Sequence, residues 1–176
     1  INDADGSGIT FDKTAPTFTA VTITSDNSID DTASKVGDEI TIELTASEAI
    51  KTGADPTITI NGNTASVARN NSTSFTATYT MSTTDIPDPA DNIAAIPFSV
   101  SNYQDVVGNA GADVTSTTDG SSVKFDPVAP TLSNVTMVSV NTSNSAYAKE
   151  GDVIRLTFSS SETNNTPTIS MLGSTA

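Results

Sequence analysis

Carboxylates are the side chains of this sequence that could form a chemical site. Of 176 residues, 21 are Asp or Glu and 7 are Lys or Arg, which gives a formal net charge of −14, and there is no His, Cys or Trp. A chain without His and Cys cannot build a zinc finger, an iron–sulfur cluster, a Cys/His pair or a Ser-His-Asp triad. The negative charge also argues against nucleic-acid binding, because Lys and Arg must neutralise phosphates there.

Calcium is the cation that these carboxylates could hold. Ca²⁺ takes about six to eight oxygen ligands at about 2.3–2.6 Å, supplied by Asp, Glu, Asn and backbone carbonyls. The candidate ligands lie at predicted junctions between repeated units, at the end of a predicted strand, or in loops before the last predicted strand: Asp12, Glu48, Asp105, Asp113, Asp119, Asp126 and Glu162. The alternative is that they are turn and surface residues, since Asp is favoured in turns and surface carboxylates keep an acidic protein soluble.

Two further acidic segments are less suited to binding a cation. Residues 2–6 resemble part of a calcium loop, but they lack the spaced ligands and the closing Glu of an EF-hand. Asp85, Asp88 and Asp91 lie in a loop that contains prolines, which we expect to be solvated. A glycosidase would need paired carboxylates in a cleft. Because aromatic residues make up only 5% of the chain and fall mostly at core-type positions, the sequence does not predict an enzyme.

A segment of the chain recurs after 114 residues. Residues 5–48 align without gaps with residues 119–162, and 18 of the 44 positions are identical. The identities include Asp-Gly-Ser at 5–7 and 119–121, Phe-Asp at 11–12 and 125–126, Ala-Pro-Thr at 15–17 and 129–131, and Ser-Glu at 47–48 and 161–162. Such a repeat indicates one structural unit per copy. We therefore predict the end of one repeat at 1–12, a complete repeat at 13–126 and the incomplete start of another at 127–176.

Apolar residues at alternate positions predict β-strands within the complete repeat. Ile40, Ile42 and Leu44 alternate with polar residues. The same pattern occurs at 21–23, 58–60, 75–81, 96–100 and 123–125, with turn signals such as Asn61-Gly62 between them. About seven short strands in roughly 110 residues predict an all-β protein of tandem immunoglobulin-like β-sandwich repeats, each about 114 residues long. Another sandwich topology is the alternative.

The last predicted repeat is incomplete. Its three predicted strands are too few to bury an independent core. We interpret the chain as a window from a longer tandem array. The alternative is a protomer whose ends are completed by neighbouring copies.

The motifs of the repeat carry a resemblance to a known group of proteins. They are Phe-Asp-x-x-Ala-Pro-Thr at 11–17, Pro-Thr-Ile-Thr-Ile-Asn-Gly at 56–62 and Asp-Val-Val-Gly-Asn-Ala at 105–110. With them the chain resembles, over essentially its whole length, the tandem bacterial and archaeal Ig-like repeats of surface-layer proteins, sheaths and large adhesins. The acidic, Thr-rich composition is similar to surface-layer proteins of marine ammonia-oxidising archaea. The resemblance implies an extracellular, cell-surface location and calcium at the junctions between modules.

We expect a structural module of an extracellular surface layer or sheath, which forms a stiff acidic array and enriches cations at the cell surface. Its expected partners are other copies of itself and cations, with no nucleic acid, and no apolar run approaches the about 20 residues of a membrane helix. The alternatives are the stalk of an adhesin, a subunit of an extracellular filament, and a spacer in a secreted enzyme. Sequons compatible with surface glycosylation occur at Asn70, Asn71, Asn134, Asn141 and Asn164.

Overall fold

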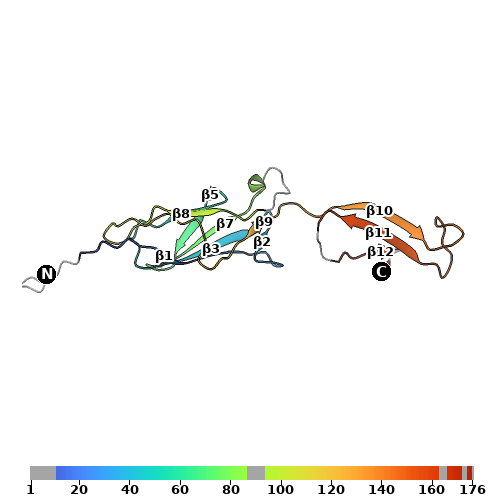
Figure 1. The fold of residues 1–176 in the computed structure, drawn as a ribbon, viewed down its shortest axis with the longest axis horizontal. Coiled ribbons are helices and arrows are strands. Elements are labelled where there is room, and N and C mark those ends of the chain that lie inside the picture. Colours follow the sequence, from blue (N-terminus) through green and yellow to red (C-terminus); the bar gives the residue numbers. More distant parts are fainter. Residues whose placement is uncertain (1–10, 87–93, 163–165, 172–173, 176) are drawn as a thin grey trace, which may run out of the picture. The chain divides into compact units, whose positions relative to one another are not determined.

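The chain folds as β-strands in two compact units. The structure is a computed structural model that describes residues 11–86, 94–162, 166–171 and 174–175. Unit 1 comprises residues 1–128 and unit 2 residues 129–176. Among the described residues the only helical element is the short 3-10 helix η1 (Thr83–Asp85), so the predicted all-β class is confirmed (Figure 1).

Two antiparallel sheets form the body of unit 1. The first has the order β1-β3-β7-β6, and its strands are β1 (Phe18–Ser25), β3 (Glu39–Ala46), β7 (Ser74–Thr80) and β6 (Ser66–Arg69). The second has the order β5-β4-β8, with β5 (Asn63–Thr64), β4 (Thr57–Ile60) and β8 (Phe98–Ser101). The short strands β2 (Ala33–Ser34) and β9 (Lys124–Phe125) pair in parallel. This arrangement is consistent with the predicted β-sandwich.

The alternating apolar residues meet in one hydrophobic core. In β3, Ile40, Ile42 and Leu44 are buried, whereas Glu43 is exposed. The opposite sheet, the β3–β4 connection and the segment 123–125, which contains β9, contribute further buried side chains, among them Ile50, Ile58, Val100, Val123 and Phe125. Each fully buried apolar side chain stabilises the fold by about 1.5–3 kcal/mol, which is why the alternation selects this face for the interior.

Hydroxyl groups cover the outer edge of β1. The Val21 amide donates to Thr118 Oγ1 and the Ile23 amide donates to Ser121 Oγ, both at 3.0 Å. The Thr118 amide returns a hydrogen bond to the Val21 carbonyl at 2.9 Å. An exposed strand edge would otherwise offer unpaired backbone groups to another chain, so the loop before β9 closes this side of the sheet.

A carboxylate clasp fixes the beginning of β3. Asp38, which is 8% exposed, accepts hydrogen bonds from Asn27 Nδ2 at 2.7 Å, from the Lys35 amide at 2.9 Å and from Lys35 Nζ at 2.8 Å. Burial acts to raise the pKa of Asp38, but the hydrogen bonds and the charge of Lys35 outweigh it and hold the pKa below its usual value. The ionised clasp ties the β1–β2 loop to the beginning of β3.

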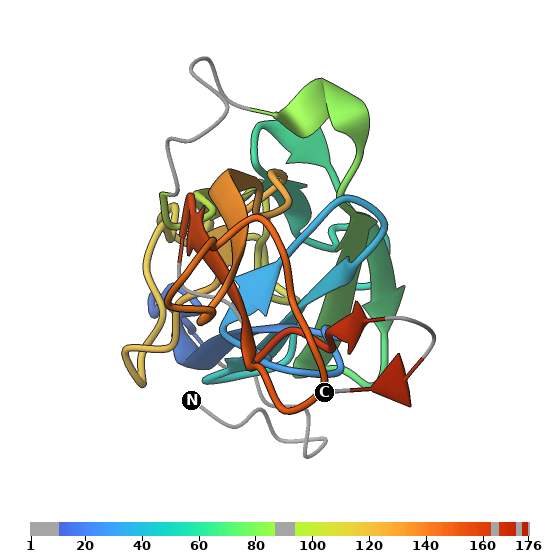
Figure 2. The same cartoon turned by 90° about the vertical axis from the view of Figure 1, so that its right-hand side faces the viewer.

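Unit 2 repeats the first hairpin of unit 1. It contains β10 (Leu132–Ser139), β11 (Ile154–Ser160), β12 (Ser170–Met171) and β13 (Ser174–Thr175), shown in orange and red in Figure 2. Met137 pairs with Leu156, just as Ile23 pairs with Ile42 exactly 114 positions earlier. The clasp recurs too, because Asp152 accepts from Asn141 Nδ2 and from the Lys149 amide and Nζ. The hairpin and its clasp therefore obey the 114-residue offset, while the full length of a repeat stays a prediction.

One close approach in unit 1 requires glycine. Tyr103 is 2% exposed and its hydroxyl donates to the Ala112 carbonyl at 2.7 Å. A Cβ on Gly111 would overlap the Tyr103 ring. We predict that Gly111→Ala lowers the free energy of unfolding by about 1–3 kcal/mol through overpacking. Chemical denaturation measures this loss. In a double-mutant cycle with Tyr103→Leu the cost should shrink, and an unchanged cost would show that the ring is not the cause.

Candidate metal site

Three of the predicted ligands meet at one end of unit 1. Asp12 lies in the segment that precedes β1, Glu48 lies two residues after the end of β3, and Asp105 lies in the loop after β8. One carboxylate oxygen from each lies within 4.8 Å of the others. The cluster is held at the end of β3 because the Ser47 amide donates to the Thr17 carbonyl at 2.7 Å and so docks the segment after β3 against the start of β1.

Asp105 organises the loop that carries it. It is fully buried, and its Oδ1 accepts from the amides of Val107, Gly108 and Asn109 at 2.9, 2.6 and 2.8 Å. Its Oδ2 accepts from Asn109 Nδ2 at 2.7 Å. Burial acts to raise the pKa of Asp105, yet these four hydrogen bonds outweigh it and hold the pKa below its usual value. Asp105 is therefore ionised at neutral pH.

Asn109 connects this loop with the segment before β1. Besides bonding Asp105, its Nδ2 donates to the Thr14 carbonyl at 3.1 Å and to the Asp12 carbonyl at 3.4 Å. Asp12 is also oriented locally, because its Oδ1 accepts from the Thr14 amide at 2.9 Å. Residues 12–14 are thus tied to the body of unit 1 by the loop that supplies the most buried carboxylate.

The carboxylates of Asp12, Glu48 and Asp105 are like charges that lie close together and repel one another. Burial raises the pKa of Glu48, and the negative charges of Asp12 and Asp105 raise it further. Among the described residues there are three ion pairs, Lys35–Asp38, Arg69–Asp55 and Lys149–Asp152, and none of them involves the cluster. A protein cation therefore does not balance the three carboxylates in the part of the chain that is described.

The donor set fits a hard cation. Oxygens that bind one Ca²⁺ at about 2.3–2.6 Å lie up to about 5 Å apart, and the 4.8 Å limit of this cluster meets that requirement. Asp12, Glu48 and Asp105 could hold the ion, with carbonyl and water oxygens needed to complete its shell. Asp105 Oδ1 already accepts three hydrogen bonds, but Oδ2 accepts only the one from Asn109 and keeps a second lone pair, so Oδ2 remains available to a metal ion.

The other four predicted ligands do not join this cluster. Asp113 and Asp119 are exposed, and Asp119 accepts from the Ser121 amide within its own turn. Asp126 accepts from the Val128 amide, in the same way as Asp12 accepts from Thr14. Glu162 is partly buried after β11. Residues 2–6 lie outside the described residues.

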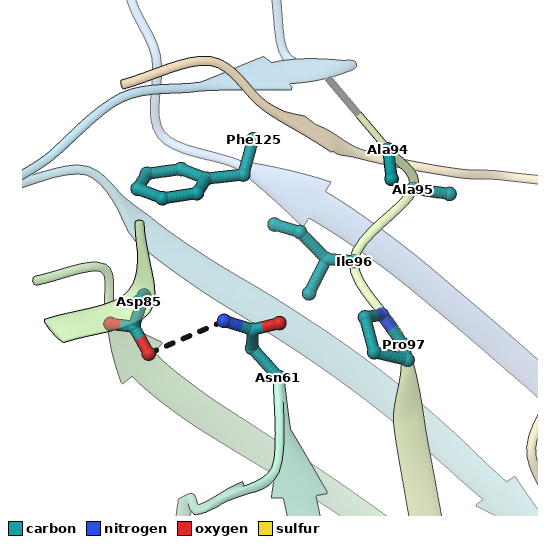
Figure 3. Close-up of a pocket in the computed structure, with 7 residues that line it drawn as sticks. All are labelled: Asn61, Asp85, Ala94, Ala95, Ile96, Pro97 and Phe125. Atoms are coloured by element: carbon teal, nitrogen blue, oxygen red, sulfur yellow. Dashed lines mark hydrogen bonds between the residues drawn. The ribbon is translucent and has the colours of Figure 1, made fainter. Parts of the chain in front are cut away.

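The expectation of a solvated loop is wrong for Asp85. This residue is 8% exposed and accepts hydrogen bonds from Asn61 and Asn63 Nδ2, from the Tyr79 hydroxyl, and from the Ser82 amide and hydroxyl. Burial acts to raise its pKa, but these contacts outweigh it and lower the pKa. Asp88 and Asp91 lie outside the described residues. Asp85 also borders a cavity of 90 Å³ (Figure 3), whose other walls include Ile96, Pro97 and Phe125.

The site residue that sequence reasoning missed is Asn109. Its signal was present in the Asp-x-x-Gly-Asn pattern at 105–109, because Asp favours turns in which its side chain bonds backbone amides. The pattern identified the loop as a motif of the repeat. It did not reveal that the Asn109 side chain would reach Thr14, 95 positions away.

Acid should destabilise unit 1 through its buried aspartates. The pKa values of Asp38, Asp85 and Asp105 are lower in the folded chain than the usual value, so their stabilisation is complete above the unfolded pKa of about 3.9 and is lost as pH falls through the folded values. We predict that thermal unfolding measured between pH 7 and pH 2 shows a falling midpoint below about pH 4.

A variant of one of these residues tests that cause. Asp85→Asn should cost about 1–3 kcal/mol at pH 7, because an amide cannot accept all the hydrogen bonds made to the carboxylate, and should make the acid decline shallower. Glu43→Gln changes an exposed carboxylate on β3 and serves as the control. If the melting temperature of both variants fell equally steeply with falling pH, Asp85 would not be a cause of the acid destabilisation.

Comparison with known proteins identifies no relative of this chain. No protein-family model, no curated protein and no solved structure matches the chain. What can be stated is that the chain is all-β and that it gathers three carboxylates able to hold a metal ion at one end of unit 1.

Proposed function

We propose that this chain is a structural module of an extracellular surface layer or sheath, in which repeated units form a stiff, acidic array. The observation that carries the proposal is the recurrence, at the 114-residue offset, of both the hairpin register and the Asn–Lys–Asp clasp. A chain that repeats a unit down to its side-chain contacts is typical of an array in which each unit contacts its neighbours in sequence.

Fixed segments between units would make such an array stiff. Pro16 is buried, and its ring restricts the backbone where the chain enters β1. Asn109 binds the carbonyls of residues 12 and 14, which leaves the segment before β1 little freedom. The same Ala-Pro-Thr sequence recurs at 129–131, ahead of β10. Pro130 would therefore restrict the backbone ahead of β10 as Pro16 does ahead of β1.

The charge of the array would concentrate cations near the cell. A net charge of −14 on 176 residues produces a negative potential that extends over a Debye length of about 8–10 Å at 0.1–0.15 M salt. Among the described residues no helix is long and apolar enough to cross a membrane. We infer that the chain's partners are other copies of itself and small cations.

Calcium is the ion that we propose for the cluster of Asp12, Glu48 and Asp105. Bound there, it would neutralise like charges and join the segment before β1 to the end of β3 and to the loop after β8. The ion would thus add a third connection to those already made by Asn109 and by Ser47. Its contribution would be mechanical.

Removing the charge of Glu48 should have opposite effects with and without calcium. In EDTA, Glu48→Gln should raise the melting temperature, because it removes a carboxylate whose ionisation is disfavoured by burial and by its two neighbours. In the wild-type chain, calcium at a hundredfold excess over its Kd should raise the free energy of unfolding by about 2.7 kcal/mol. The variant should lose most of that gain in calorimetry.

Asp119→Asn provides the matched control, because it removes an exposed carboxylate outside the cluster. It should retain the full response to calcium. A wild-type chain whose unfolding is the same in EDTA and in calcium would rule out the metal site, while the proposal of a structural array would stand on the repeat.

The location and arrangement of the array need a separate measurement. We expect antibodies raised against this chain to label the outside of intact source cells in a periodic two-dimensional pattern under the electron microscope. Isolated rods that project from the surface would instead support an adhesin stalk, and labelling confined to the cell interior would refute the proposed function.

A further inference from the structure

The β10–β11 hairpin of unit 2 exposes a face that is buried in unit 1. Val135 and Met137 of β10 are 58% and 67% exposed, whereas their counterparts 114 positions earlier, Val21 and Ile23, are 0% and 3% exposed. In β11, Ile154, Leu156 and Phe158 are only partly buried. Their counterparts in β3 are almost completely buried. The two hairpins therefore have similar sequences and the same register, but the apolar face is covered in unit 1 and exposed in unit 2.

Unit 1 shows what covers this face. Its core adds side chains from strands that follow β4 in the sequence, including Phe75 of β7, Phe98 and Val100 of β8, and Phe125 of β9. In unit 2, Met171 of β12 takes the place of Ile60 at the end of β4, because Pro-Thr-Ile at 167–169 aligns with Pro-Thr-Ile at 56–58. The covering strands have no counterpart among the described residues of unit 2.

An apolar cavity lies where those strands would pack. It has a volume of 390 Å³ and is lined by Met137, Ile154, Ser170 and Met171. The counterparts of its three apolar lining residues are Ile23, Ile40 and Ile60, which belong to the core of unit 1 and are at most 3% exposed. The cavity therefore corresponds to an unfilled part of a core whose filled form is visible in the same chain.

The edge of β10 lacks its cover in the same way. In unit 1 the hydroxyls of Thr118 and Ser121 accept from the amides of Val21 and Ile23. No equivalent contact to Val135 or Met137 is found among the described residues. Arg155 is the only charged residue in β10 or β11, and it belongs to the exposed set of the β11 alternation. Charge therefore does not oppose the approach of an apolar sheet.

We propose that the apolar face of β10 and β11 is a docking surface for the second half of a repeat of this same sequence, equivalent to residues 61–126. The proposal rests on the array described under the proposed function. It specifies the occupant, which must present a Phe at the β8 position and a Val-x-Phe strand at the β9 position, as Phe98 and 123–125 do in unit 1.

A single thiol can report whether the face becomes covered. The chain has no Cys, so Met137→Cys introduces one probe. We compare its maleimide labelling in the 176-residue chain with that in an extended chain, in which a copy of residues 61–126 follows Met171. We expect fast labelling in the first and labelling slowed by about 100-fold in the second, because a core position reacts only after local opening.

Matched variants separate docking from other causes of protection. Ile23→Cys, at the equivalent position of unit 1, should be protected in both chains, and Val106→Cys, which is 63% exposed in the native side chain, should react fast in both. Phe98→Asp placed only in the added copy should restore fast labelling of Met137→Cys. Hydrogen exchange of the β10–β11 amides in chains that keep Met137 gives the same comparison without a substitution in the face.

Three outcomes would overturn the proposal. The first is equally fast labelling in the extended chain. The second is protection in the 176-residue chain that grows with protein concentration, which would identify a second copy as the occupant. The third is protection in that chain at every concentration, which would mean that the face closes on itself. None of these depends on calcium, so the response of the Glu48→Gln variant still tests the proposed metal site separately.

Discussion

The antiparallel pairing of β1 with β3 is the interaction on which the rest of unit 1 depends. Its register directs Val21, Ile23 and the apolar set of β3 to one face, around which both sheets assemble. The same register determines what lies at the two ends of β3. At the beginning, Asp38 is clasped by Asn27 and Lys35, and at the end Glu48 is carried to the segment before β1. A slip of one residue would turn every side chain of the strand to the other face and displace both ends.

The buried carboxylates of unit 1 illustrate two solutions to one physical problem. Ionised groups are costly inside a protein unless donors surround them. Asp85 and Asp105 meet this requirement with hydrogen bonds from backbone amides and neutral side chains, which lower their pKa values although burial opposes this. Burial raises the pKa of Glu48, and its two neighbouring carboxylates raise it further. This contrast distinguishes a carboxylate that supports a loop from one that would benefit from a cation, although all of them look alike in the sequence.

The long strands were predictable because their signal is local. Alternation within 40–44 and 75–81 needs only the period of a strand, and β3 and β7 include all of these residues except Met81. The short parallel pair β2–β9 has no such signal, since two residues cannot show a period. Within the site, Asp12 and Glu48 were candidates at recurring positions and Asp105 was a candidate in the loops before the last predicted strand, but only the folded chain brings them together. Asp85 was misjudged because, besides Ser82, its donors are Asn61, Asn63 and Tyr79, which a turn pattern around residue 85 does not reveal.

The internal repeat separates what a strand specifies from what its surroundings specify. β10 and β11 keep the register and the clasp of β1 and β3, so these features arise from the hairpin's own sequence. The burial of the hairpin does not arise from its own sequence, because Ile23 is 3% exposed and Met137 is 67% exposed at equivalent positions. Apolar alternation therefore creates a face that requires a cover, and the cover comes from strands that lie further along the repeat, such as β7 and β8. In an array built this way, the hairpin would define where each module begins, and the strands that follow it would determine whether the module closes.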